Sequence, residues 1–519
     1  MFDIFAYRHW FNKYFSKRDF LFVFVLIVAY LITRLINLDQ FPIFTDEGIY
    51  IHWAKIAWKD AAWRFISLTD GKQPLHTWGM IPFLKLFPDN LLLGGRLFSV
   101  LTGFVSLTGL FLFLSYVFSK RTGYIGAIFY IFTPMFMFYD RMALADSAVN
   151  AGFIWILFGT VLLIQTLRLD VALLLGMVSG FALLAKSSTQ MFMGLGIFAP
   201  ILLKVKKQKR FVKNTANYFV LYLVAMAIAF VIYNVQRLTP YLHYVAEKNN
   251  TFVMTFQEFS KNPSAVLFSN IPIIPVYVAS EMAYVLAFIG LAGFYFMYKR
   301  HKRMAMYLAI WIILPFIAIA ALAKVIFPRY IMFFATLLTI PAAVLMSEVK
   351  DKRVPIVLGA VYVASIAYFN YTIWFDNKNI PFPPVDRGQY VESFNAGWGI
   401  KDMITFSREK AKDRPVILVA EGNFGVIADM LESSLAMSDT NISVRGYWPL
   451  DLAQLKENQA ALVDHNVFVV FSHREEFPAD WPIRLIKKYP KPGGKYNYYL
   501  YELLPSMTIG RAPFFLTSR

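Results

Sequence analysis

The sequence predicts a polytopic α-helical membrane protein with about eleven transmembrane helices and a C-terminal extracytoplasmic α/β domain. Three observations lead to this fold class. Hydrophobic residues make up 58% of the chain and charged residues only 16%, against roughly 25% charged in soluble domains. Apolar runs that approach the roughly 20 residues of a membrane span recur through the first 375 residues. The net charge of +18 lies in those same residues, because the remainder holds 17 basic and 17 acidic side chains.

The candidate spans and the basic clusters between them predict the orientation. Eleven apolar segments cover about 20–38, 91–118, 122–139, 143–166, 171–187, 190–203, 215–236, 273–298, 305–326, 330–347 and 354–375. With the N-terminus inside, every basic cluster falls on the cytoplasmic side, as the positive-inside rule requires. The first apolar run has no small-residue cleavage site, so we interpret it as a retained anchor. The clusters lie at 8–18, 120–121, 204–213, 299–303 and 350–353.

The same topology places three segments outside: 39–90, 237–272 and 376–519. In the last, the apolar runs 416–420, 467–471 and 498–503 are typical of buried strands, and a helical stretch at 425–435 lies between them. The proline-rich stretch 377–384 reads as a linker. We therefore expect a transmembrane domain at 1–375 and a soluble α/β domain at 376–519.

The composition also excludes several classes of site. The chain has no cysteine and so no disulfide, thiolate metal site or cysteine nucleophile. Its 7 histidines show no ligand spacing, which argues against a zinc site. The basic excess belongs to the hydrophobic part and no groove-reading module accompanies it, so we expect contact with membrane lipids and no nucleic acid.

Charged side chains gather beside the spans on the predicted outer side. Ionisable groups at such places are costly and usually face a cavity or a partner. Opposite charges at one membrane face could bind an anionic headgroup and deprotonate a hydroxyl. The acids are Asp46, Glu47, Asp140 and Asp146, and the bases are Lys72, Arg141, Lys186, Lys324 and Arg329.

Each of these groups has a structural alternative. Asp46 and Glu47 could be a solvated pair or cap a helix N-terminus. Asp146 could cap its span or pair with Arg141, and Asp140 could form a local ion pair with Arg141. The cations Lys72, Arg329 and above all Lys186 could be interfacial anchors whose ends reach water. The segment 421–425, EGNFG, follows a strand but lacks the phosphate-binding fingerprint, so we interpret it as a structural turn.

Five motifs in order resemble those of the GT-C membrane glycosyltransferases, in the branch of the protein O-mannosyltransferases and lipid A aminoarabinose transferases. Two are acidic, FTDEGIYIHWA at 44–54 and RMALAD at 141–146. The segment GKQPLHTWGMIPFLKLF at 71–87 is similar to the Lys-Pro-Pro-Leu region of that branch, although Gln73 replaces the first proline. Gly95-Arg96-Leu97 and Pro328-Arg329-Tyr330 complete the series.

The resemblance implies a role for each matched residue. Asp46 resembles the catalytic base that deprotonates the acceptor hydroxyl, and Glu47 resembles its orienting partner. Asp146 is similar to the second acid of the cavity, which supports donor or acceptor binding. Lys72 and Arg329 resemble the cations that hold the donor phosphate, and Arg141 and Tyr330, which lie in the matched motifs, are placed with them. The three acids could also supply oxygen ligands to a divalent metal, and no other cofactor is implied.

The expected function is therefore an inverting glycosyltransfer from a polyprenyl-phosphate sugar to a glycan, lipid or protein acceptor at the outer face of the plasma membrane. A positioned carboxylate base suits a hydroxyl that attacks an anomeric carbon, and fixed cations stabilise the departing phosphate. The alternatives are a transporter or flippase of lipid-linked sugars and a non-catalytic scaffold. A transporter should show repeats and charges near the bilayer middle, and the sequence shows neither.

Overall fold

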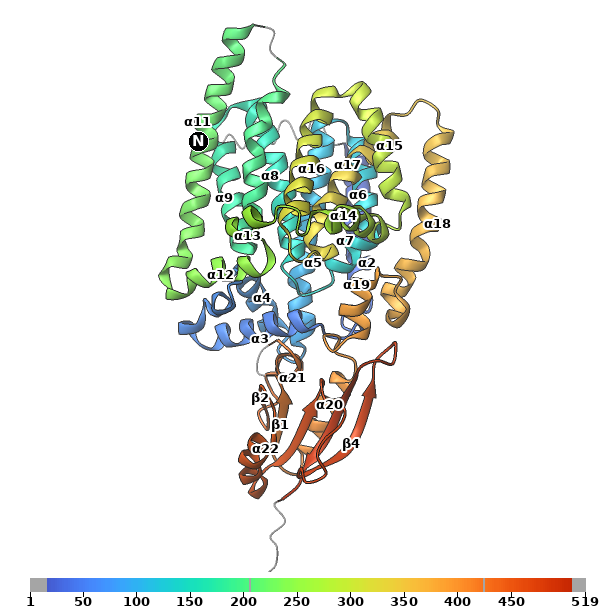
Figure 1. The fold of residues 1–519 in the computed structure, drawn as a ribbon. Coiled ribbons are helices and arrows are strands. Elements are labelled where there is room, and N and C mark those ends of the chain that lie inside the picture. Colours follow the sequence, from blue (N-terminus) through green and yellow to red (C-terminus); the bar gives the residue numbers. More distant parts are fainter. Residues whose placement is uncertain (1–15, 205–206, 423–424, 506–519) are drawn as a thin grey trace, which may run out of the picture. The chain divides into compact units, whose positions relative to one another are not determined.

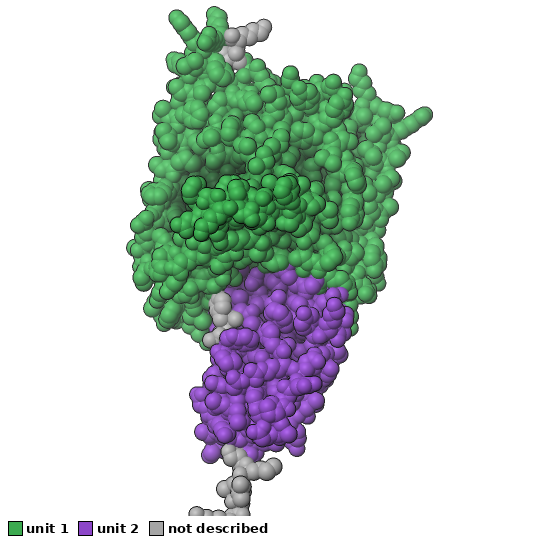
Figure 2. All heavy atoms as spheres, viewed as in Figure 1, with its two compact units in different colours: residues 1–41, 53–87, 92–387 green, residues 42–52, 88–91, 388–519 purple. Residues whose placement is uncertain are grey.

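The computed structural model describes residues 16–204, 207–422 and 425–505 and contains two compact units (Figures 1 and 2). Unit 1 comprises residues 1–41, 53–87 and 92–387, and unit 2 comprises 42–52, 88–91 and 388–519. This division lies beyond the expected boundary at residue 375 and places the acidic outer segment 42–52 with the C-terminal residues. Arg8, Lys13 and Lys206, which belong to the basic clusters, lie outside the described residues.

Unit 1 is built from helices (Figure 1). Long apolar segments favour them because a helix satisfies all backbone hydrogen bonds within one segment. The longer ones are α2 (Lys17–Leu35), α4 (Leu75–Leu86), α5 (Leu91–Val117), α6 (Lys120–Phe132), α8 (Asp146–Thr166), α9 (Leu169–Ala185), α11 (Gln208–Tyr233), α12 (His243–Phe252), α14 (Leu267–Glu281), α15 (Val285–Arg300), α16 (Lys302–Leu322), α17 (Met332–Glu348) and α18 (Arg353–Phe375). Short elements join them: η1 (Ala61–Trp63), η2 (Ile66–Asp70), α7 (Pro134–Tyr139), α10 (Thr189–Leu195), η3 (Gly196–Leu202), η4 (Asn234–Leu238), η5 (Pro240–Leu242), α13 (Phe256–Lys261), η6 (Pro328–Ile331), η7 (Asn377–Asn379) and α19 (Pro384–Arg387).

Six helical segments among the described residues are long and apolar enough to cross a membrane, or seven if one bent pair counts as a span. The six begin at residues 91, 146, 208, 302, 328 and 353. The other expected spans fall on α2, on the α6–α7 pair and on shorter apolar helices, so the count of eleven is not confirmed. The predicted class itself, a helical membrane protein with a C-terminal sheet domain, is confirmed.

The expected span at 273–298 is the bent pair. Helices α14 and α15 meet at an angle of 110°. At the break, Ala283 and Tyr284 have φ values of 51° and 59°, the left-handed region that L-residues rarely adopt. Pro272 and Pro275 lie within α14, where each removes a backbone donor. Such a break is a local backbone event that hydropathy cannot detect.

Unit 2 holds a five-stranded sheet in the order β2-β1-β3-β5-β4. The strands are β1 (Val416–Glu421), β2 (Ile442–Tyr447), β3 (Asn466–Phe471), β4 (Ile483–Pro490) and β5 (Asn497–Leu503). Strands β2, β1 and β3 run parallel, whereas β5 is antiparallel to β3 and to β4. Unit 2 also contains the α-helices α20 (Ile400–Lys410), α21 (Ile427–Ser434) and α22 (Leu452–Gln459). A short π-helix, η8 (Gly388–Glu392), and a short 3-10 helix, η9 (Ala460–Val463), complete it.

The sheet explains why three of its strands are visible in the sequence. Every residue of β1 is buried, and β3 and β5 are almost entirely so. Central strands covered on both faces read as continuous apolar runs, and these three runs were predicted. The edge strands β2 and β4 carry exposed polar residues and give no such signal. One core cluster includes Ile417, Val469, Phe471 and Tyr499.

Candidate active site

In unit 1, Asp146 lies between two cations contributed by separate helix ends. It begins α8, where negative charge is favoured by the helix dipole. Lys186, the C-cap residue that follows α9, donates from Nζ to Asp146 Oδ1 at 2.9 Å, and Arg329 Nε lies 3.8 Å from Oδ2. Asp146 and Arg329 are 6% and 5% exposed. One nearly buried carboxylate therefore holds two cations in fixed positions.

Aromatic rings complete this cluster. Lys186 Nζ lies 3.8 Å from the centre of the Tyr330 ring. The Arg329 guanidinium is 5.1 Å from the ring of Phe327 and 5.2 Å from that of Tyr330. Cation–π contacts of this kind orient a cation without neutralising it. The structure thus brings the predicted Asp146, Arg329 and Tyr330 together and adds Lys186, whose ammonium group donates a hydrogen bond to Asp146 in addition to being partly exposed.

A histidine and a buried acid adjoin the cluster. His76, in the first turn of α4, is fully buried near Ala143 and Asp146. Burial lowers the pKa of His76 to about 4, against the opposing charge of Asp146, so this ring is neutral near pH 7. On α19, Asp386 accepts a hydrogen bond from the Tyr139 hydroxyl, and burial raises the pKa of Asp386 although the charge of Arg329 opposes the effect.

Lys72 and Arg141 have other immediate neighbours. Lys72 Nζ lies 3.7 Å from Asp70 Oδ2 and 5.5 Å from the ring centre of Trp53, and its side chain is 20% exposed. Arg141 donates from Nη1 to the carbonyls of Thr33 at 3.1 Å and Arg34 at 2.9 Å. Arg141 is 4% exposed. It therefore satisfies carbonyls at the C-terminal end of α2, which an α-helix leaves without partners.

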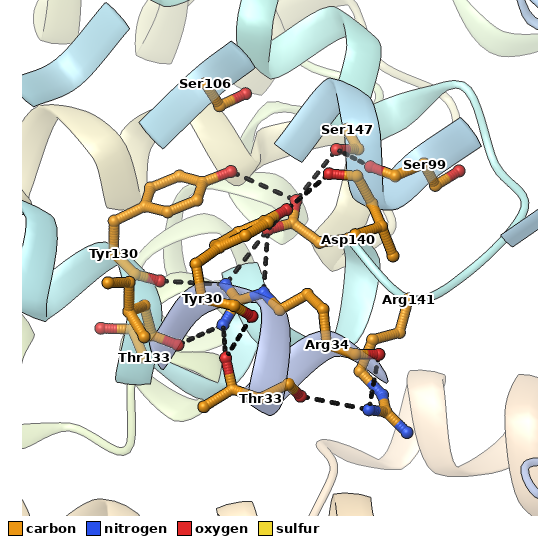
Figure 3. Close-up of polar contacts among 12 residues, drawn as sticks. Tyr30, Thr33, Arg34, Ser99, Ser106, Tyr130, Thr133, Asp140, Arg141 and Ser147 are labelled. Carbon is orange, nitrogen blue, oxygen red and sulfur yellow. Dashed lines mark hydrogen bonds and ion pairs between the residues drawn. The ribbon is translucent and has the colours of Figure 1, made fainter. Parts of the chain in front are cut away.

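Asp140 belongs to a buried network that fixes the segment before Asp146 (Figure 3). Its Oδ2 lies 3.1 Å from Nη2 of Arg34 in α2, and both side chains are 0% exposed. The hydroxyls of Tyr130 and Ser147 donate to Oδ1 at 3.2 and 2.9 Å. The expected local pair with Arg141 is wrong, because the carboxylate turns toward α2.

This network also depends on a close approach of α5. A Cβ at Gly103 would overlap the Asp140 carboxyl group and the Tyr30 hydroxyl. The Tyr30 hydroxyl donates to the Val100 carbonyl at 2.7 Å. Helices α2 and α5 and the turn after α7 are therefore locked together by satisfied polar groups. Buried polar groups are tolerated when they are paired in this way.

In unit 2, Asp46 and Glu47 lie in the first turn of α3 (Thr45–Lys59). Glu47 is 0% exposed and accepts at Oε2 the Phe44 N–H at 3.0 Å, a contact that caps the helix start. Asp46 is partly exposed. The predicted orienting partner thus fixes the backbone on which the predicted base lies.

The same segment is fastened to the rest of unit 2. The Thr45 amide donates to the Asn395 carbonyl at 3.0 Å, and the Gly397 amide to the Ile43 carbonyl at 2.8 Å. Ser433 in α21 donates to the Gly48 carbonyl at 2.6 Å. These bonds join residues that are far apart in the chain, so the predicted base lies on a surface that the C-terminal residues help to build.

Gly48 permits this docking and provides a test of it. A Cβ there would lie 3.0 Å from Met430 N and 3.1 Å from Met430 Cα, both backbone atoms of α21. We expect Gly48→Ala to destabilise unit 2 by about 1–3 kcal/mol through overpacking, measured as a lower thermal unfolding midpoint. The control is Gly388→Ala, where a Cβ meets nothing within 4 Å. Equal midpoints for both variants would contradict the tight contact.

No group of three or more His, Cys, Asp or Glu side chains that could hold a metal ion occurs within 16–204, 207–422 and 425–505. We assign no step to the divalent metal that the three acids could ligate.

Comparisons with known proteins show which families and structures this chain is similar to. Residues 71–233 match the family model described as dolichyl-phosphate-mannose-protein mannosyltransferase. The chain is similar to the crystal structure of ArnT from Cupriavidus metallidurans bound to undecaprenyl phosphate, with 13% identity, a TM-score of 0.60, and coverage of 92% of this chain and 97% of that one. It is also similar to AglB, the Archaeoglobus fulgidus oligosaccharyltransferase in complex with an inhibitory peptide and a dolichol-phosphate, with 13% identity, a TM-score of 0.50, and coverage of 89% and 70%. No curated protein matches the chain.

Proposed function

We propose that this chain, a membrane-embedded protein with the fold of the GT-C glycosyltransferases, moves a sugar from a polyprenyl-phosphate donor to an acceptor hydroxyl at the outer membrane face. The observation that carries the proposal is the nearly buried cluster of Asp146, Lys186 and Arg329. Two cations held by one carboxylate leave positive charge for a phosphate. The structural neighbour ArnT carries undecaprenyl phosphate, a ligand of that chemistry.

The proposed roles follow from the charge that develops during transfer. As the bond between the anomeric carbon and the phosphate oxygen breaks, the lipid phosphate gains negative charge, which Arg329, Lys186 and Lys72 stabilise. Tyr330 orients the first two by its ring, and Asp146 holds both through its two carboxylate oxygens. Arg141 acts by holding the end of α2 in place.

Asp46 takes the proton from the acceptor hydroxyl as that oxygen attacks the anomeric carbon. Glu47 positions it by capping the helix start. A phosphate leaves without protonation, so no second carboxylic acid is required, in contrast to glycoside hydrolysis. A single displacement inverts the anomeric centre. The acceptor is a glycan, a lipid or a protein, and the direct test is sugar transfer from a polyprenyl-phosphate donor by the purified chain.

The donor-binding role predicts a measurable loss of affinity. Arg329→Ala and Lys186→Ala should each weaken donor binding by roughly tenfold to a hundredfold, because a hydrogen bond to a charged group is worth about 1.5–3 kcal/mol. We expect the same direction for Lys72→Ala. Binding of a short-chain polyprenyl phosphate to each purified variant measures the effect.

The matched control is Lys120→Ala. Lys120 Nζ pairs with Asp19 at 3.0 Å and is 35% exposed, close to the 2.9 Å and 33% of Lys186 with Asp146. Lys120 belongs to a cluster that we predict to be cytoplasmic, so donor affinity should not change. Native affinity in all three site variants would show that these cations do not bind the phosphate.

The outer location has its own test. The basic clusters predict that residues after 375 lie outside the cytoplasm. A reporter that is active only outside the cytoplasm, fused after Arg519, should be active, and one fused at Lys207 should not. A stable but inactive fusion after Arg519 would reverse the orientation and with it the proposed side of the reaction.

A further inference from the structure

The parallel strands of unit 2 end in a group of polar and aromatic side chains that the proposed transfer does not use. Strand β1 has β2 on one side and β3 on the other, so the order of connection reverses between β1 and β3. In open α/β sheets, ligands bind outside the carboxyl ends of the strands at such a switch point. Here β1 ends at Glu421, and Ser472 and His473 directly follow β3. We call Glu421, Ser472, His473 and Trp448 the strand-end site.

Glu421, the buried last residue of β1, fixes the geometry of this site. It is 2% exposed. Its Oε2 accepts the backbone N–H groups of Ser472 at 2.8 Å and His473 at 2.7 Å, and the Ser472 hydroxyl at 3.3 Å. Burial alone favours the protonated form, but these hydrogen bonds and the contact with His473 hold the pKa of Glu421 below its ordinary value. The carboxylate is therefore ionised near pH 7, and its Oε2 atom is occupied by these hydrogen bonds.

The two ring nitrogens of His473 have different surroundings. Its Nδ1 lies 2.7 Å from Ser472 Oγ and 3.4 Å from Glu421 Oε2. Within the described part of the chain, Nε2 has no hydrogen-bond partner, and the side chain is 29% exposed. The ring is held between Phe394 and Trp448, with centroid distances of 4.6 and 5.4 Å. One polar atom thus stands out from an aromatic wall.

Trp448 supplies the open face of that wall. It directly follows β2, and 59% of its surface is exposed. An indole ring is costly to leave in water, and exposed aromatic side chains are enriched where proteins bind partners. A ring face of this kind, beside a donor or acceptor nitrogen, suits a ligand with both an apolar face and hydroxyl groups.

A hydrolytic role does not fit these contacts. A serine nucleophile needs Nε2 of the histidine, with the acid on Nδ1. Here the Ser472 hydroxyl and the Glu421 carboxylate both meet Nδ1. The arrangement holds His473 in one orientation and leaves Nε2 available to an external group. This geometry suits the binding of a ligand and not hydrolysis.

An anionic ligand does not fit either, because the nearby charges are already paired. Arg474 Nη1 lies 2.7 Å from Asp451 Oδ1. The Gly425 amide, at the turn before α21, donates to Asp429 Oδ2 at 2.7 Å, so this backbone donor is already satisfied within the chain. Asn423 and Phe424 of the predicted structural turn lie outside the described residues.

We propose that the strand-end site binds a neutral pyranose unit, with one sugar face on the Trp448 indole and a hydroxyl on His473 Nε2. The C–H groups of such a sugar face carry partial positive charge and meet the electron-rich face of the ring. The site lies wholly in unit 2 and its binding requires no donor. The pyranose belongs either to the acceptor of the proposed transfer or to a separate saccharide.

Saturation-transfer NMR with the full chain tests the proposal. The chain is held in lipid nanodiscs, since glycoside detergents would compete, and the probes are the methyl pyranosides of glucose, galactose and mannose. At least one should receive saturation in the native chain. Trp448→Ala should weaken its apparent affinity by roughly tenfold, and Trp448→Phe should restore part of it. The control is Trp63→Ala, at an indole that is 41% exposed in unit 1.

The proposal would be overturned if no pyranoside received saturation from the native chain, or if the native chain and Trp448→Ala gave equal saturation transfer. Trp448 is exposed, so an unchanged unfolding midpoint is expected and checks that the variant is folded. The kinetics of enzymatic sugar transfer then show whether the bound pyranose belongs to the acceptor or to a separate saccharide. A raised acceptor KM with unchanged kcat in Trp448→Ala assigns the site to the acceptor, and an unchanged KM assigns it to a separate saccharide. If the enzymatic sugar-transfer assay fails but the NMR experiment shows pyranoside binding, the proposed function is contradicted and the proposed binding site is not.

Discussion

Asp46→Asn is expected to lower the rate of sugar transfer by roughly a hundredfold to ten-thousandfold, the usual contribution of a general base. The amide keeps the shape of the carboxylate and cannot accept the proton of the acceptor hydroxyl. Donor affinity should remain, because the proposed phosphate contacts lie on other residues. The measurement is a single-turnover rate with a polyprenyl-phosphate sugar, alongside donor binding.

Two further substitutions serve as a comparison and a control for Asp46→Asn. Glu47→Gln should be milder, since its amide oxygen can still accept the Phe44 N–H that caps the helix start. Asp60→Asn is the control, because Asp60 is an exposed acid on the same predicted outer loop and only caps η1. Full transfer by Asp46→Asn would remove the base assignment. Equal damage from both acidic substitutions with loss of donor binding would point to a structural role for the pair.

Arg34→Met is expected to destabilise the chain by about 3–5 kcal/mol, because it leaves the buried Asp140 carboxylate without its cation. Asp140→Leu should lower stability in the same direction, because it leaves the buried Arg34 guanidinium without its carboxylate. In the double variant Arg34→Met/Asp140→Leu, no buried charge remains, so the loss should be smaller than the sum of the single losses. The measurement is the unfolding free energy of each variant in one detergent.

The control for this pair is Arg168→Met. Arg168 and Asp170 form an ion pair of 2.7 Å, but the Arg168 side chain is 43% exposed. Exposed pairs contribute at most about 1 kcal/mol. If Arg34→Met and Arg168→Met cost the same, the network in Figure 3 is not what holds the turn before Asp146.

The sequence predicted those parts of the fold that depend on local pattern. Continuous apolar runs gave β1, β3 and β5, and long apolar segments gave α5, α8, α11, α16, α17 and α18. The five ordered motifs gave a GT-C resemblance that the family match and the structural neighbours confirm. Asp146, Arg329 and Tyr330 were predicted and lie together.

What could not be predicted is the choice of partners. Lys186 follows an apolar run and reads as an anchor, yet the fold brings it to Asp146 from 40 positions away. Arg34 lies inside an apolar helix and pairs with Asp140 at a separation of 106 positions. A charge within such a run was the available signal, because it needs a buried partner. Identifying that partner requires the tertiary packing.

The docking of residues 42–52 on the C-terminal residues limits how such proteins can be recombined. A chimera that exchanges only residues 388–519 would separate Gly48 from its Met430 contact and Thr45 from the Asn395 carbonyl. The segments 42–52 and 88–91 belong to the same compact unit and must be exchanged with it. The same holds for truncation, since removal of the C-terminal residues strips the Asp46 segment of its supports. In this chain, the unit to be exchanged or removed is therefore discontinuous in sequence.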